Sequence, residues 1–280
     1  MTGAGAGLGR IYSLMFARLG ANIVVNDVSA KGAQSVVDEI KSGNCYRMNT
    51  SSTLYLIIKF FSPAGGKAVP AITSAEDGDG IVKTALENFG SIHVLIANAG
   101  ILRDRSFTAM SEAEWDAVIA IHLRGTYKCI KACWPVFQKQ KYGRILTTAS
   151  GVGIYGNFGQ ANYSTAKGAI IGLTRTAAAE GSRYNILANV VAPKAGTAMT
   201  QTVWTPEMVE MIKPDYVAPI VGYLGSEANK ETSGSLFEVE VGWAAQTRWE
   251  RAFGVAFPHK KELTPEMIIG KWGEITMFGT

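Results

Sequence analysis

The sequence predicts an α/β fold in which helices cover both faces of a doubly wound parallel sheet. Three observations lead to this class. Short runs of β-branched and other apolar residues alternate with longer segments of helical pattern. The short runs are apolar nearly throughout, as in strands that are covered on both faces. The length of 280 residues suits one large domain.

The elements follow in chain order from this alternation. We expect strands at residues 21–26, 67–72, 94–97, 144–148, 186–191 and 236–241. We expect helices at residues 10–19, 30–41, 77–89, 112–139, 162–181 and 214–224. Residues 1–242 are assigned to a single domain, and residues 243–280 to an aromatic-rich extension that packs on the domain or on a partner copy.

Two places depart from the pattern. A glycine-rich phosphate loop follows a strand in doubly wound sheets, but here the loop begins at Thr2, so we expect the first, central strand to be missing from this chain. Residues 43–63 separate a helix from a strand, where about two to six residues are usual. They contain no acidic residue and many aromatic and hydroxyl residues. We interpret them as intervening sequence read through as protein, with a true surface insertion as the alternative.

Composition and charge argue against several classes of protein. The net charge is +4 and the basic residues are scattered, so we expect no nucleic-acid partner. The most apolar run outside the strands, residues 54–61, is too short to span a bilayer, and the start of the chain lacks the pattern of a signal peptide. The three cysteines form no CxxC pair, so we expect neither a disulfide framework nor a metal site.

The glycine-rich start has the form of a dinucleotide-binding loop. Residues 2–9 read TGAGAGLG and lead into a helix. Gly3, Gly7 and Gly9 would let backbone amides approach a pyrophosphate at the helix N-terminus, as in a Rossmann-like fold. A glycine-rich turn without a ligand is the plain alternative. Asp27 ends the next strand, where a carboxylate accepts hydrogen bonds from the adenine ribose and repels a 2′-phosphate, which favours NAD over NADP. A helix cap is the alternative for Asp27.

Three further residues form a candidate catalytic group. Tyr163 and Lys167 lie four residues apart on a predicted helix, so their side chains point the same way. A nearby ammonium favours the phenolate and lowers the pKa of the tyrosine, which then takes the proton of a secondary alcohol. Ser150 follows a predicted strand, where its hydroxyl would bond the substrate oxygen. An exposed helical pair is the alternative for Tyr163 and Lys167.

Together these motifs resemble the short-chain dehydrogenase/reductase family. The resemblance is carried by TGAGAGLGR at the start, Asn98-Ala99-Gly100, Ser150 and YSTAK at residues 163–167. Longer strings resemble one branch, the dehydrogenase units of peroxisomal multifunctional enzymes type 2, particularly the fungal ones. These strings are ILRDRSF at 101–107, KYGRI at 141–145, GIYGNFGQANYS at 153–164 and TRWERA at 247–252.

The resemblance implies a reaction and a setting. The reaction is NAD-dependent oxidation of (3R)-hydroxyacyl-CoA to 3-ketoacyl-CoA in fatty-acid β-oxidation. The setting is the peroxisome, although the chain does not end in an SKL-type address. The partners implied are an acyl-CoA substrate, a longer parent chain with a hydratase domain, and a homodimer or a second dehydrogenase unit. Two alternatives stay open: a dehydrogenase of another secondary alcohol such as a steroid, and an inactive chain from a flawed gene prediction.

The resemblance also assigns roles. Tyr163 becomes the base, Lys167 holds the nicotinamide ribose and lowers the pKa of the tyrosine, and Ser150 positions the substrate oxygen. Asn98 lies on the adenosine side, and residues 193–197 border the nicotinamide. The cofactor-binding positions implied are Gly3, Gly7, Leu8, Gly9, Asp27, Asn98, Tyr163, Lys167, Pro193 and Thr197.

A few positions depart from the family pattern. His122 stands where many relatives place an asparagine that supports the lysine through water, and a packing role is its alternative. Ala97 replaces an asparagine of many relatives, and Thr73 replaces an aspartate that usually contacts adenine. Residues 238–242, EVEVG, replace a stretch richer in glycine. The chemistry-bearing residues are present, whereas the expected cradle for the cofactor is altered.

Overall fold

The computed structural model describes residues 1–43, 66–196, 205, 207, 211–258 and 262–279. The chain divides into two compact units, Met1–Gln246 and Thr247–Thr280. All but the first residue of the proposed intervening segment 43–63 lies outside the described residues. Thr197 also lies outside them.

The first unit is built on parallel strand pairs. Strand β1 pairs with β2, and β3, β4, β5 and β6 pair in that order, with every one of these pairs parallel. A further strand, β7, lies next to β6 after a turn at Gly242. The strands are β1 (Ile23–Asn26), β2 (Ala68–Ala71), β3 (Val94–Ala97), β4 (Gly143–Thr148), β5 (Ile186–Pro193), β6 (Leu236–Glu240) and β7 (Trp243–Thr247).

The backbone of the first two residues joins β1 to β3. The Met1 amino group donates to the Val24 carbonyl at 2.9 Å, and the Asn26 amide donates to the Met1 carbonyl at 3.0 Å. On the other side, the Thr2 amide donates to the Ile96 carbonyl at 3.0 Å. Met1 and Thr2 therefore lie between β1 and β3, at the place of the central strand that we expected to be missing, and these two residues are not assigned to a strand.

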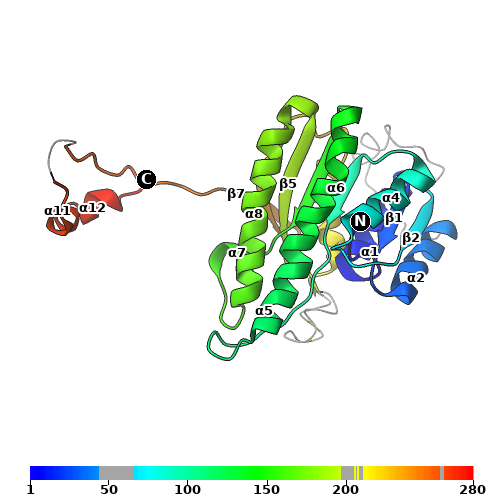
Figure 1. Ribbon diagram of the computed structural model, residues 1–280, viewed down its shortest axis with the longest axis horizontal. Coiled ribbons are helices and arrows are strands. Elements are labelled where there is room, and N and C mark those ends of the chain that lie inside the picture. The colour runs from blue at the N-terminus through cyan, green and yellow to red at the C-terminus, as the bar shows by residue number, and fades with distance from the viewer. Residues whose placement is uncertain (44–65, 197–204, 206, 208–210, 259–261, 280) are drawn as a thin grey trace. The chain divides into compact units, whose positions relative to one another are not determined.

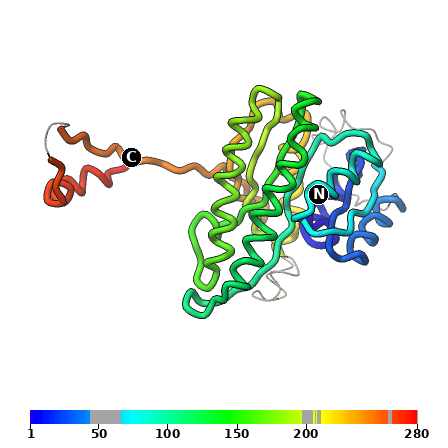
Figure 2. The backbone as a smooth tube through the Cα atoms, viewed as in Figure 1, coloured from blue at the N-terminus to red at the C-terminus, as the bar shows by residue number. Residues whose placement is uncertain are grey.

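Helices cover both faces of this sheet, as Figure 1 shows, and the path between them can be followed by colour in Figure 2. One buried apolar cluster draws on α1, α2 and α10, and a second draws on α4, α6 and α8. The helical elements are α1 (Gly7–Arg18), α2 (Ala30–Lys41), α4 (Gly78–Phe89), α5 (Glu112–Ile119), η1 (Ala120–Arg124), α6 (Gly125–Gln140), α7 (Gly151–Tyr155), α8 (Ala161–Gly181), η2 (Ser182–Tyr184), η4 (Pro214–Tyr216) and α10 (Ala218–Leu224).

Local sequence signals account for several helix ends. Ser29 caps α2 by accepting from the Gly32 amide, and Asp77 caps α4 by accepting from the Gly80 amide. Ser111 and Glu114 form a capping box at the start of α5. Helix α4 ends at Gly90, whose positive φ of 72° suits a residue without a side chain.

The prediction of one continuous helix at residues 112–139 was wrong in one respect. A π-helical turn, η1, separates α5 from α6. Such a turn widens the helix locally, and π-helical turns are frequent at functional sites. Here the turn carries His122 with a side chain that is only 1% exposed.

Other boundaries also moved. The helix expected at 214–224 is a 3-10 turn, η4, followed by α10 after Val217. The expected strands at 21–26, 67–72 and 236–241 are one or two residues shorter than predicted, because ladder pairing decides where a strand ends and apolar composition does not.

The second unit contains two short helices, α11 (Pro265–Gly270) and α12 (Trp272–Ile275). The Phe253 amide donates to the Met277 carbonyl at 3.0 Å, which closes the unit on itself. Whether the extension packs on the domain or on a partner stays a prediction. Among the helices in the described ranges, none has the length and apolar character to cross a membrane.

Candidate active site

Ser150 and Tyr163 meet at the carboxyl end of β4. Strand β4 ends at Thr148, and Ser150 follows as the N-cap of α7, where its hydroxyl accepts from the Val152 amide at 3.2 Å. Tyr163 lies in the first turn of α8, which packs against α7. The Ser150 side chain lies near enough to the Tyr163 hydroxyl to act on its pKa in the lowering direction. The two hydroxyls that the sequence predicted to act on one substrate oxygen are therefore together.

Lys167 lies one turn further along α8 and is buried, with 3% of its surface exposed. Its ammonium donates to the Thr148 carbonyl at 2.5 Å and lies 5.6 Å from the centre of the Tyr163 ring. Burial lowers the pKa of Lys167 to about 7, because the charged form loses its water. The expected grouping of Tyr163, Lys167 and Ser150 is present in the structure.

Tyr163 titrates differently from what its spacing to Lys167 predicted. Burial raises the pKa of Tyr163 above its ordinary value of 10, the hydrogen bond from Ser150 acts in the lowering direction, and the charge of Asp104 raises it further. The net direction is the reverse of the lowering expected from the ammonium. The physical reason is that desolvation of the phenolate outweighs the effects that favour it.

His122 lies against Tyr163. Its ring meets the Tyr163 ring edge-on, with the centres 5.1 Å apart and an angle of 82°. Its Nε2 atom is 2.9 Å from the amide nitrogen and 2.8 Å from the carbonyl oxygen of Ile101. Burial lowers the pKa of His122 to about 3, and the charge of Lys167 acts in the same direction, so the ring is neutral at pH 7. Its Nδ1 atom is buried and makes no hydrogen bond to a described residue.

The glycine loop has the geometry that a dinucleotide requires. Gly3 and Gly7 adopt positive φ angles of 59° and 51°. A Cβ atom on Gly3 would lie 2.7 Å from the Ala99 Cα, and one on Gly9 would overlap the Gly3 carbonyl oxygen. Helix α1 begins at Gly7 without a side-chain cap, so its first amides point into the loop. This close, glycine-lined turn at a helix N-terminus fits a pyrophosphate.

Asn98 holds the glycine loop from the neighbouring strand. Its Nδ2 atom lies 3.3 Å from the carbonyl oxygens of both Thr2 and Gly3. The Thr2 hydroxyl accepts in turn from the amides of Asn98 and Ala99, each at 3.0 Å. Asn98 therefore shapes the loop directly, and its expected contact on the adenosine side stays a prediction.

Asp27 lies at the carboxyl end of β1, as expected. One carboxylate oxygen accepts from the Gly5 amide at 2.9 Å and the other from the Ser29 amide at 2.9 Å. The side-chain cap of α2 is Ser29. Asp27 thus links the glycine loop to the next helix, and its carboxylate stands beside the loop, where an adenine ribose would lie.

Two further residues that the sequence predicted to bind the cofactor, Pro193 and Leu8, lie at the end of β5 and at the start of α1. Pro193 is the last residue of β5, and the following Lys194 amide donates to the Val239 carbonyl at 2.8 Å. Leu8 is partly buried and packs against the core cluster that contains α1. Because Thr197 lies outside the described residues, its border with the nicotinamide stays a prediction.

The unusual acids on β6 have partners. The Tyr155 hydroxyl donates to Glu238 at 2.7 Å, and Lys194 forms an ion pair with Glu240 at 2.8 Å. Both contacts join β6 to segments that flank the candidate site, α7 and the end of β5. Thr73 is also engaged, because its hydroxyl donates to Asp77 at 3.0 Å.

Comparisons with known proteins agree with this site. The family described as short chain dehydrogenase matches residues 67–208. Peroxisomal hydratase-dehydrogenase-epimerase of Neurospora crassa is 50% identical over 99% of this chain and 29% of its own length. A hydroxyacyl-CoA dehydrogenase of Mycobacterium tuberculosis is 39% identical over 85% of this chain and 75% of its own length. The crystal structure of a short chain dehydrogenase from Mycobacterium avium superposes with a TM-score of 0.80 at 34% identity, covering 100% of this chain and 97% of that one.

The chain belongs to the short-chain dehydrogenase family. It is an oxidoreductase with a Rossmann-like fold, and this family uses a nicotinamide dinucleotide, either NAD or NADP. The resemblance to the dehydrogenase units of peroxisomal multifunctional enzymes is confirmed. The chain spans 29% to 59% of the length of the multifunctional relatives that it matches.

Proposed function

We propose that this chain oxidises (3R)-hydroxyacyl-CoA to 3-ketoacyl-CoA with NAD, as a step of fatty-acid β-oxidation. The observation that carries the proposal is the grouping of Ser150, Tyr163 and Lys167 at the carboxyl end of β4, at the sheet edge that also holds the glycine loop. The hydroxyacyl-CoA dehydrogenase relative, which this chain covers over 75% of its length, supports the substrate class.

The residues divide the chemistry between them. The Ser150 hydroxyl bonds the oxygen on C3 of the substrate and holds it near the Tyr163 hydroxyl. Tyr163 takes the proton from that oxygen as the phenolate, a form that burial of its hydroxyl disfavours and that a positive charge on Lys167 would favour. Lys167 stands behind the tyrosine ring, where its ammonium stabilises the phenolate and would bond the nicotinamide ribose. Bound NAD supplies the acceptor for the hydride that leaves C3.

Asp27 supports NAD over NADP. Its two oxygens accept from the Gly5 and Ser29 amides and remain able to accept from ribose hydroxyls. A 2′-phosphate at that place would bring two anions together. We therefore propose NAD as the working cofactor.

The setting of the reaction is proposed from the relatives. Their names describe peroxisomal enzymes that join several activities, and this supports a peroxisomal location for this chain. It also supports pairing of this dehydrogenase unit with a second copy or a second unit of the same kind. Acyl-CoA would be the small-molecule partner.

The test is turnover by the purified chain, followed as the absorbance of NADH. We expect oxidation of (3R)-3-hydroxyacyl-CoA and little or none of the 3S epimer or of a hydroxysteroid. Preferred turnover of the steroid would contradict the proposed substrate class. Calorimetry measures separately whether NAD binds. Binding is expected if the dinucleotide site is formed, and a chain that does not bind NAD would contradict the proposed function.

A further inference from the structure

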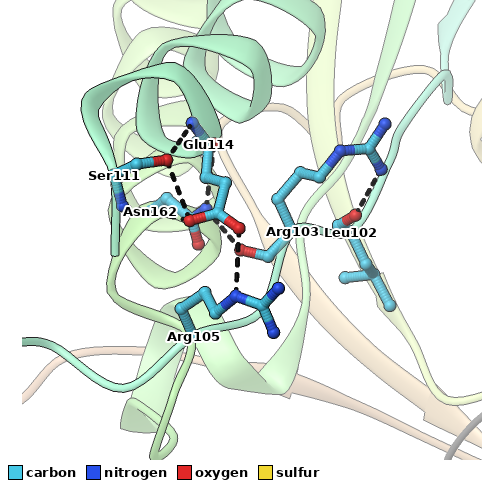
Figure 3. Close-up of polar contacts among 6 residues, drawn as sticks. All are labelled: Leu102, Arg103, Arg105, Ser111, Glu114 and Asn162. Carbon is cyan, nitrogen blue, oxygen red and sulfur yellow. Dashed lines mark hydrogen bonds and ion pairs between the residues drawn. The ribbon is translucent and has the colours of Figure 1, made fainter. Parts of the chain in front are cut away.

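Asn162, the residue directly before the catalytic tyrosine, is completely buried and engaged on both sides of its amide. The Nδ2 atom donates to the Arg103 carbonyl at 2.9 Å and to the Glu114 carbonyl at 3.2 Å. The Oδ1 atom accepts from the Tyr163 amide at 2.7 Å. Figure 3 shows this side chain between the connection that follows β3 and the start of α5. One amide therefore joins three separate segments.

The two segments that accept hydrogen bonds from Asn162 are held in place by further hydrogen bonds. The Glu114 carboxylate accepts from the Ser111 amide at 3.0 Å and from the Arg105 Nε at 3.1 Å. The Arg105 amide donates to the Gly159 carbonyl at 2.8 Å, just before α8. Asn162 therefore connects the first turn of α8 to the segment after β3 and to α5, which other hydrogen bonds already hold in place.

An asparagine is specifically suited to this place. Its amide nitrogen offers two donors to two carbonyls, while its oxygen serves the orphan amide at the start of the helix. Alanine would leave the Arg103 and Glu114 carbonyls without this partner. Aspartate has the same shape but no donor, so it would set a carboxylate oxygen against two carbonyl oxygens.

We propose that Asn162 is a positioning residue that fixes where the Tyr163 hydroxyl stands relative to Ser150 and the substrate oxygen. The proposal rests on the proposed function. Asn162 contacts the backbone of Tyr163, whose ring packs edge-on against His122 and whose hydroxyl lies near Ser150. A displacement of the reacting group by ~1 Å can cost about 100-fold in rate, so a loose first turn affects the chemical step most.

The test compares Asn162→Ala and Asn162→Asp with a matched control, Thr174→Val. Thr174 is also fully buried on α8 and hydrogen-bonds the Ile170 carbonyl and the Thr147 hydroxyl, both at 2.7 Å, but it lies three turns away from Tyr163. We expect both Asn162 variants to lose about 10- to 100-fold in kcat, with the KM for NAD within about twofold. The control should keep kcat within about twofold at a comparable loss of Tm.

A second readout needs no substrate and separates this proposal from the proposed function. The Tyr163 ring carbon that bears the hydroxyl is followed by NMR in tyrosine-labelled protein, and Tyr163→Phe assigns its signal. Because Ser150 acts to lower the pKa of Tyr163, a Tyr163 hydroxyl displaced from Ser150 should titrate at higher pH in the Asn162 variants. An unchanged titration, or a kcat loss no larger than that of Thr174→Val, would overturn the proposal. Failure of the parent chain to oxidise hydroxyacyl-CoA, with the titration shifted as expected, would overturn the proposed function alone.

Discussion

The ammonium of Lys167 is hydrogen-bonded to the carbonyl of Thr148, with 2.5 Å between the nitrogen and the oxygen. This contact joins the second turn of α8 to the last residue of β4, two residues before Ser150. The lysine therefore holds the helix of the tyrosine against the strand of the serine, apart from any role toward the cofactor. Burial of the charged end of Lys167 lowers its pKa to about 7, because the ammonium loses its water.

Replacing the base should stop turnover and leave the cofactor site in place. Tyr163→Phe removes the hydroxyl that takes the proton, and the loss of a general base costs typically about 100- to 10,000-fold in rate. We expect turnover to fall by at least that range while NAD binds as in the parent chain. NADH absorbance measures the first quantity and calorimetry the second. Loss of both together would instead mark Tyr163 as a structural residue.

The glycine loop should not tolerate a methyl group at its tightest point. In Gly9→Ala the new Cβ would meet the Gly3 carbonyl and the Ala4 Cα, so the loop must open and NAD binding should fall at least about tenfold. Gly172→Ala is the matched control, because a Cβ there meets nothing within 4 Å and the position is inside α8. That control should bind NAD normally and gain about 1 kcal/mol of stability. Equal NAD affinity in both variants would argue against a pyrophosphate at this loop.

Asp27 should control the choice between the two dinucleotides. Asp27→Ala removes the carboxylate that bonds the Gly5 amide and would repel a 2′-phosphate. We expect the KM for NAD to rise and the ratio of kcat/KM values for NAD and NADP to fall at least about tenfold, in line with the loss of a charged hydrogen-bond partner. Initial rates with each dinucleotide at saturating substrate give the ratio. A ratio equal to that of the parent chain would mean that Asp27 only joins the loop to α2.

Burial of His122 should make the protein sensitive to acid. Its pKa is about 3 in the folded chain and 6.5 as the ordinary value, so between these pH values the unfolded chain binds a proton that the folded chain does not. The stability due to neutral His122 is therefore complete above pH 6.5 and falls toward pH 3 by up to about 1.4 kcal/mol per pH unit. Urea unfolding at pH 7 and pH 5 measures the slope.

The variant His122→Gln should flatten that pH dependence, because an amide can still bond Ile101 but does not titrate. His93→Gln, at an exposed position, serves as the control and should unfold like the parent chain at both pH values. If His122→Gln and the parent chain lose the same stability on acidification, other groups are responsible for the acid sensitivity.

Much of the fold was predictable because its signals are local. Apolar runs marked β3, β4 and β5 to within a residue or two, and capping residues such as Ser29 and Asp77 start helices where the pattern began. Spacing alone placed Tyr163 and Lys167 on one side of a helix. These features depend on residues within about two turns of each other, which periodicity can report.

The rest depends on distant contacts. The partners of the Asn162 amide, Arg103 and Glu114, lie 59 and 48 residues away in the chain, so no local pattern reveals them. The only available signal was that Asn162 directly precedes Tyr163. The π-helical turn at His122 was missed because one widened turn leaves the spacing of apolar residues nearly helical. The direction of the Tyr163 pKa was missed because burial is a property of the folded chain.

The widened turn at Ala120–Arg124 gives the stretch from α5 to α6 one residue more than a regular α-helix would use for the same rotation. Removing one residue there would let the backbone close into a regular α-helix while the apolar faces of α5 and α6 keep nearly their present directions, whereas a deletion inside either helix would turn one part against the other by about 100°. Natural versions of this chain should therefore differ in length by one residue at this turn more often than within α5 or α6.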